Sequence, residues 1–252
     1  MNRITAILLL LLFLFGTSHI SAQQSTKVPI PKIGIDIGTS DSPEEVSTTL
    51  EILLLMTILS LAPSIVIMTT SYLRIIIAFS FLRNALGTMQ MPPNQLLAGI
   101  ALFITFFIMA PTVNKINDNA LQPYLDGKIS LDSASTNAIG PLREFMLKHA
   151  REEDLALFIS FAEMEKPATR NDLPTYILIP AFVISELRAG FIIGFFLFIP
   201  FLMIDMIVSS ILMSMGMMMI PPMMVALPFK ILLFVLVDGW NLVVGSLIRS
   251  FL

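Results

Sequence analysis

The sequence predicts an all-helical membrane protein built from kinked helical hairpins. Hydrophobic residues make up 56% of the 252 positions, only 13% are charged, and the mean hydropathy is +0.85. A surface exposed to water does not tolerate this composition. Long stretches lack any charge, and prolines interrupt them, which is typical of broken helices in membrane proteins.

Composition also excludes several function classes. The net charge of -3 is too small to favour a nucleic-acid partner. The chain has no cysteine and only two histidines, His19 and His149, so thiolate or histidine metal sites cannot be built within one chain. The sequence contains no His-Glu-x-x-His, no Gly-x-Ser-x-Gly and no phosphate-binding glycine loop. We therefore expect no enzyme activity, no cofactor and no metal.

The N-terminal region has the order of a cleavable secretory signal. Arg3 precedes an apolar run from Ile4 to Phe15, and small and polar residues follow up to Ala22. The apolar run is too short to span a bilayer. We expect residues 1–22 to be the signal peptide and residues 23–49, rich in Pro, Gly, Ser and Thr, to be a flexible extracytoplasmic lead.

Residues 50–112 are expected to form a first hydrophobic hairpin. The charge-free run Ile52–Leu73 is long enough to cross a bilayer, and a second helix is expected over Asn94–Met109, between Pro92-Pro93 and Pro111. Arg74 and Arg83 fall in the expected connection. They are interpreted as topology anchors on the cytoplasmic side.

Residues 113–175 differ in character. Charges of both signs alternate with apolar residues at helical spacing, as in Leu142, Phe145 and Met146 and again in Leu155, Phe158, Ile159 and Ala162. By alternation, this segment is expected to be an extracytoplasmic helical subdomain, either an interaction module or a simple connector.

Residues 176–252 are expected to form a second hydrophobic hairpin. Pro180 is expected to mark a turn, and Pro200 to divide the apolar run into pieces at Tyr176–Ile199 and Phe201–Ser214. Gly190 and Gly194 have the small-xxx-small spacing that allows two helix backbones to approach closely.

Charged residues inside this apolar hairpin should have partners, because an unpaired charge there is costly. We expect Asp205 to pair with Lys230, and Glu186 to pair with Arg188 or with a base of a neighbouring subunit. Asp238 follows Lys230 by eight residues and is expected on the same helix face. Structural pairing and proton relay are both open roles for these residues.

The stretch from Met203 to Lys230 holds nine of the chain's 17 methionines. Methionine is unbranched and its thioether is soft, so clustered methionines suggest a deformable apolar surface, although they are also common packing residues. Pro221 and Pro222 should form a loop within this stretch.

Ordered blocks along most of the chain resemble the FliP family of flagellar export-gate proteins. The blocks include Thr70–Ile77 (TSYLRIII), Leu82–Thr88 (LRNALGT), Pro92–Gln95 (PPNQ), Ile199–Leu202 (IPFL), Leu227–Lys230 (LPFK) and Val237–Trp240 (VDGW).

This resemblance implies a core subunit of the type III protein export gate in the bacterial inner membrane, at the flagellar basal body. It implies five copies, assembled into a helical channel complex with FliQ-like and FliR-like subunits, next to FlhB-like and FlhA-like export proteins, with unfolded flagellar proteins as substrates. Met215, Met217, Met218 and Met219 map onto the family's methionine-rich gasket.

Two alternatives remain at this stage. One is the corresponding subunit of a virulence type III secretion system, which the signal peptide and the long lead disfavour. The other is a proton-coupled membrane transporter, for which the two halves show no evident inverted repeat.

Overall fold

A computed structural model describes residues 43–88, 91–164, 167, 169–217 and 219–252. The expected signal peptide and most of the expected flexible lead lie outside these residues. Contacts divide the chain into two units, residues 1–51 and 52–252. Apart from the first turns of one helix, all that follows concerns the second unit.

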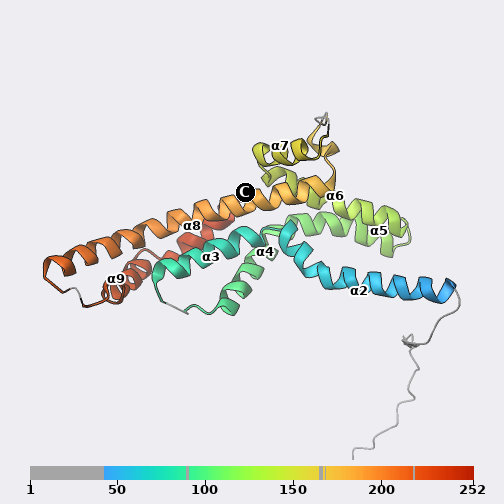
Figure 1. Ribbon diagram of the computed structural model, residues 1–252. Helices are drawn as coiled ribbons and strands as arrows, with labels where there is room; N and C mark the ends of the chain where they lie inside the picture. The colour runs from blue at the N-terminus through green and yellow to red at the C-terminus, as the bar shows by residue number, and fades with distance from the viewer. Residues whose placement is uncertain (1–42, 89–90, 165–166, 168, 218) are drawn as a thin grey trace, which may run out of the picture. The chain divides into compact units, whose positions relative to one another are not determined.

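Regular structure in the described residues is entirely helical, which confirms the predicted class (Figure 1). In chain order the elements are α2 (Pro43–Thr69), α3 (Tyr72–Leu86), α4 (Asn94–Ile116), the π-helix η1 (Asn117–Leu121), α5 (Gln122–Leu125), α6 (Leu131–His149), α7 (Glu152–Phe161), the 3₁₀-helix η2 (Arg170–Asp172), α8 (Thr175–Ser214), α9 (Pro222–Leu236) and α10 (Gly239–Arg249).

The first hydrophobic run is broken earlier than predicted. Helix α2 ends at Thr69, where the hydroxyls of Thr69 and Thr70 donate to backbone carbonyls four residues back, each at 2.8 Å. The segment expected to be a connection is helix α3, and both Arg74 and Arg83 lie in it. The connection was predicted from charge alone. Buried residues recur at every third or fourth position of this segment, and their packing stabilises the segment as helix α3.

Prolines end fewer helices than predicted. Helix α4 continues through Pro111, and α8 is a single 40-residue helix through Pro180 and Pro200. Each proline removes one backbone hydrogen bond, and a long helix with many other bonds and packed neighbours tolerates that loss. Met109 and Phe182, each two residues from Pro111 and Pro180, and Phe201, next to Pro200, are buried and add such packing.

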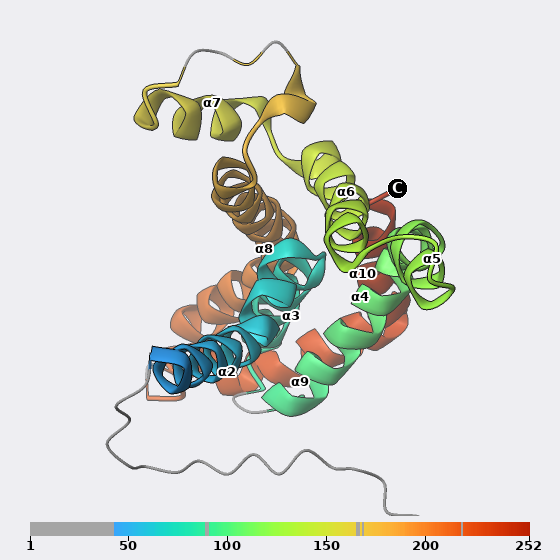
Figure 2. The same ribbon diagram turned by 90° about the vertical axis from the view of Figure 1, so that its right-hand side faces the viewer.

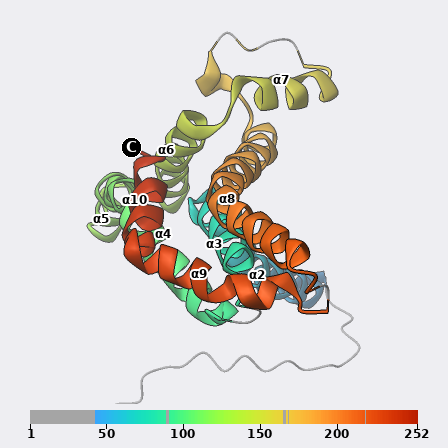
Figure 3. The same cartoon turned by 90° about the vertical axis from the view of Figure 1, so that its left-hand side faces the viewer.

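The last apolar segment contains a bend that was not predicted. Helices α9 and α10 are bent relative to each other by 63°. Figure 3 shows the two helices on either side of this bend. Asp238 lies between them in the left-handed region, with φ of 50°. Lys230 and Asp238 are therefore on different helices, and the expectation that they share one helix face is wrong, because a helix face exists only while the backbone stays helical.

Helix α8 is the element around which the second unit packs. Helix α8 makes its most extensive contact with α3, and it also contacts α6, α7 and α9. Helix α3 in turn contacts α4 (Figure 2). One buried cluster joins α3, α4, α8, α9 and α10, with Phe79 and Leu247 at its centre. A second cluster joins α6, α7 and the first turns of α8, with Phe182 and Leu178 fully buried.

Within the part of the chain that the structure describes, three helices are long and apolar enough to cross a membrane: Leu50–Thr69, Asn94–Leu125 and Thr175–Ser214. The bent pair of α9 and α10 would be a fourth if it counts as one span. Large apolar side chains on these helices are exposed, including Leu54, Phe103 and Phe196. Such surfaces need lipid or protein to cover them.

Candidate functional site

Residues 215–221, here called the methionine loop, connect α8 to α9. Helix α8 ends because Gly216 adopts a left-handed conformation, with φ of 74°. The Gly216 N–H donates to the Met213 carbonyl at 3.1 Å, and the Met217 N–H donates to the Leu212 carbonyl at 3.0 Å. This is the Schellman arrangement, which satisfies the last carbonyls of a helix.

The methionine loop ends at Pro221 and Pro222, which cap and begin α9. Proline suits this position because its missing N–H would have no helical partner there. The expected gasket side chains Met215, Met217 and Met219 are 63%, 43% and 97% exposed. Met218 lies outside the described residues. The loop thus presents at least three flexible apolar side chains at the tip of the α8–α9 hairpin.

Asp205 and Lys230 lie together on facing helices of the same hairpin. The Lys230 Nζ atom is 2.6 Å from Asp205 Oδ2, and it also donates to the Ala85 carbonyl of α3 at 3.0 Å. The lysine side chain is only 3% exposed, whereas the aspartate is 29% exposed. A buried ammonium needs such partners, and here two other helices supply them.

Glu186 has a different partner from the one expected. Its carboxylate accepts two hydrogen bonds from Arg74 of α3, at 2.9 Å from Nε and 2.5 Å from Nη2. Arg188 is exposed, because residues two apart on a helix point in different directions. Arg74 was interpreted as a topology anchor at the membrane surface. It is instead one half of a buried bidentate ion pair that joins α3 to α8.

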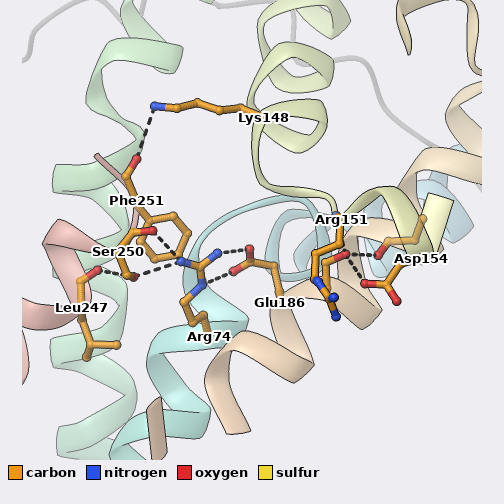
Figure 4. A network of polar contacts seen from close by, with 10 residues as sticks. Arg74, Lys148, Arg151, Asp154, Glu186, Leu247, Ser250 and Phe251 are labelled. Atoms are coloured by element: carbon orange, nitrogen blue, oxygen red, sulfur yellow. Dashed lines mark hydrogen bonds and ion pairs between the residues drawn. The ribbon is translucent and has the colours of Figure 1, made fainter. Parts of the chain in front are cut away.

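Arg74 also holds the end of α10, as Figure 4 shows. Its Nη1 donates to the Ser250 carbonyl at 2.8 Å and to the Ser250 hydroxyl at 2.9 Å. The guanidinium lies 3.8 Å from the centre of the Phe251 ring, a cation–π contact. One side chain therefore ties three helices that are far apart in sequence.

Ser185 extends this network toward α7. Its hydroxyl donates to Asp154 Oδ2 at 2.7 Å and accepts from the backbone N–H of Arg151 at 3.0 Å. Because Ser185 and Glu186 are adjacent on α8, one turn of that helix binds α7 on one side and α3 on the other. These hydrogen-bonded residues, here called the polar centre, lie between the two apolar clusters. They are Arg74, Asp154, Ser185, Glu186 and Ser250.

The remaining site residues are placed as follows. Asp238 precedes α10, and its Oδ2 accepts a hydrogen bond from the Asn241 side chain at 3.1 Å, while its side chain does not cap the backbone of that helix. A Cβ atom at Gly190 would lie 3.1 Å from Ile77, and one at Gly194 would lie 2.5 Å from Phe81. The helix that approaches these glycines closely is α3 of the same chain.

No catalytic or ligand-binding arrangement stands out in the described residues. They contain no group of three or more acidic or histidine side chains that could hold a metal ion. An open groove of about 760 Å³ lies between α4, η1 and α6, lined by both Lys115 and Glu144. These two exposed side chains pair with each other across it.

Sequence reasoning missed Arg74, Ser185 and Ser250 as members of the polar centre. A signal for Arg74 was available, because it follows a long charge-free run directly and an ionisable residue in such surroundings usually has a partner. Ser185 and Ser250 carried no comparable signal, since serine is common and unremarkable in membrane helices.

His149, at the end of α6, titrates abnormally. Its ring packs between Phe145 and Phe251, with ring centres 4.7 Å and 5.2 Å away. Burial, together with the smaller effects of the positive charges of Arg74 and Lys148, lowers the pKa of His149 from 6.5 to about 4. The histidine is therefore neutral in the folded protein near pH 7.

This shift predicts a pH dependence of stability. Between pH 6.5 and about 4 the unfolded chain binds a proton at His149 and the folded chain does not. The stabilising contribution of neutral His149 to the free energy of unfolding is therefore complete above pH 6.5, and it is lost as the pH falls toward 4. Thermal unfolding of the detergent-purified protein should show this loss, and His149→Asn should show a shallower pH dependence. Equal slopes for the two proteins would contradict the assignment.

The chain is similar to known proteins along most of its length. A model of the FliP family matches residues 55–247. The flagellar biosynthetic protein FliP of Bacillus subtilis (strain 168) is 59% identical over 217 residues, which cover 86% of this chain and 98% of that protein. The proteins of the same name from Caulobacter vibrioides and Aquifex aeolicus are 49% and 47% identical, over 87% and 88% of this chain and 82% and 92% of their own.

Proposed function

The chain belongs to the FliP family, and from this premise we propose that it is a core subunit of the flagellar type III protein export gate. The relatives are named flagellar biosynthetic proteins, which favours the flagellar system over a virulence system. The three described helices that are long enough to cross a bilayer support a location in a membrane. The flagellar names of the relatives favour the bacterial inner membrane at the flagellar basal body. The proposal contains no catalytic step.

The proposed working form is an assembly. Five copies associate with FliQ-like and FliR-like subunits, and with FlhB-like and FlhA-like export proteins, around a channel for unfolded flagellar proteins. The exposed apolar side chains of α2, α4 and α8 leave room for this, because such surfaces can be covered by neighbouring subunits as well as by lipid. In this arrangement residues 1–22 are removed and residues 113–175 face away from the cytoplasm.

The observation that carries the proposal is the methionine loop. It places at least three exposed methionines at the tip of a hairpin. The Schellman motif at the end of α8 and the prolines at the start of α9 fix the two ends of the loop. Copies of this loop around an axis would form a ring of thioethers. Such a ring excludes water and ions when closed, and its flexible side chains yield to a passing polypeptide without binding it tightly.

Replacing Met217, Met218 and Met219 together by alanine should open a leak while the gate still assembles. Alanine lacks the reach to close the centre of the ring, so cells expressing the variant should become sensitive to small polar toxins. The matched control replaces Met203, Met206 and Met213 of α8, which changes composition equally within the same hairpin. A variant with an intact barrier and normal export would refute the gasket.

A further inference from the structure

Lys230 joins its own helix to two others through one atom. It belongs to α9, its Nζ atom donates to Asp205 of α8 at 2.6 Å, and the same atom donates to the Ala85 carbonyl of α3 at 3.0 Å. The side chain is buried. An ion pair between α8 and α9 alone would not require the bond to α3.

The bond to Ala85 has a clear physical reason. Helix α3 ends at Gly87, whose left-handed backbone, φ of 73°, stops the helix, and the Gly87 N–H donates to the Asn84 carbonyl at 3.2 Å. Ala85 is one of the last four residues of α3, whose carbonyls have no partner within the helix and carry the negative end of the helix dipole. A cation is the preferred group at this position.

The same contact brings the end of α3 against the start of α9. A Cβ atom at Gly87 would lie 3.7 Å from Lys230 Nζ and 3.8 Å from Met223 Cγ. Met223 lies in the first turn of α9, directly after the methionine loop. The turn that follows α3 therefore meets Lys230 and the first turn of α9, and the methionine loop ends where that first turn begins.

We propose that Lys230 couples the turn after α3 to the methionine loop, so that the ammonium holds both in one arrangement. The consequence of this coupling rests on the proposed function: the coupled arrangement is the one in which the methionine loop closes the channel. Lys230 is a positioning residue in this scheme. It touches neither the channel nor the substrate and acts through the backbone of α3 and the carboxylate of α8.

The test measures the coupling directly and separately from the seal. The chain has no native cysteine, so spin labels can be attached at Thr88→Cys and Met219→Cys, in assembled gates where most copies are unlabelled. The distance between the two labels should be narrowly distributed in the parent. It should lose its narrow peak in Lys230→Met, which keeps the length of the side chain and removes the donor. Lys128→Met is the matched control, because Lys128 pairs with Asp126 on the exposed surface.

The charge swap Asp205→Lys with Lys230→Asp separates this idea from a simple ion pair. The swap restores opposite charges between α8 and α9, but it places a carboxylate against the Ala85 carbonyl, so the distance distribution should stay broad. A narrow distribution in the swap, or in Lys230→Met, overturns the proposal. If Lys230→Met does not assemble, Lys230→Gln decides by the same criterion, since its shorter amide cannot reach both partners.

The leak assay on the same variants keeps the two ideas apart. Lys230→Met should show the toxin sensitivity of the triple methionine variant. If the triple variant does not leak, the gasket fails, while the label distances still report whether Lys230 couples the two segments. If the triple variant leaks and the distances do not change in Lys230→Met, the coupling alone is wrong.

Discussion

Replacing Glu186 by leucine should lower the free energy of unfolding by about 3–5 kcal/mol, because it leaves a buried charge without its counter-ion. Arg74 is almost fully buried and keeps its positive charge in any protein environment. The variant would retain only the bonds of Arg74 to Ser250 and its contact with the Phe251 ring. Helices α3 and α8 would then face each other across an uncompensated cation.

The partner variant should be less damaging, although it removes more hydrogen bonds. In Arg74→Met the remaining carboxyl of Glu186 can take up a proton and become neutral, a route that arginine lacks. The double variant Arg74→Met with Glu186→Leu should recover much of the loss, since an apolar pair of similar volume often replaces a buried ion pair at little cost. The coupling between the two sites follows from the double-mutant cycle.

Unfolding in mixed detergent micelles would measure these differences in free energy. The control is Glu144→Leu, which removes the exposed partner of Lys115 and should change stability by only about 0–1 kcal/mol. A Glu186→Leu variant no less stable than Glu144→Leu would show that the buried pair does not hold α3 against α8. Additive losses in the double variant would show that the two residues act independently.

Gly194→Ala should destabilise the contact between α3 and α8 by about 1–3 kcal/mol through overpacking. The added Cβ would lie 2.5 Å from Cγ and 2.8 Å from Cβ of Phe81. The second of these atoms is attached directly to the backbone, so rotation of the ring cannot remove the clash. The ring is further held edge-to-face against Phe191, with centres 5.4 Å apart. The two helices must therefore separate.

Two other glycines provide the comparison. Gly190→Ala should cost less, because the nearest atoms of Ile77 lie at 3.1 Å and small shifts can accommodate them. Gly99→Ala in α4 meets nothing within 4 Å and should be neutral or stabilising by about 0.5–1 kcal/mol, as expected inside a helix. The measurement is again unfolding in mixed micelles. Equal effects at Gly194 and Gly99 would rule out close packing as the role of Gly194.

Features with short sequence separation were predictable. The start of α4 after Pro92-Pro93 and the loop between Gly216 and Pro221 follow from glycine and proline conformations that depend on few neighbours. Pro222 was expected in that loop, and it is instead the first residue of α9. Asp205 and Lys230 face each other in one hairpin, and their pairing needs only the fold of that hairpin.

Features that depend on distant neighbours were not predictable. Pro111, Pro180 and Pro200 each have the local chemistry of a helix break, yet packing carries the helices through them. Asp238 lies within an apolar run that local chemistry continues as one helix, yet the chain bends there. Local rules give each position one preference, and contacts from other elements decide whether that preference prevails.

The sequence by itself determined the helical class, the membrane character, the methionine loop and the family, because these depend on composition, short-range backbone preferences and ordered blocks of residues. Only the tertiary structure decided that Arg74 pairs with Glu186, 112 residues away, and that Lys230 also binds α3. A buried charge dictates that some partner must exist. Which partner it has depends on which helices lie side by side, and no local pattern contains that information.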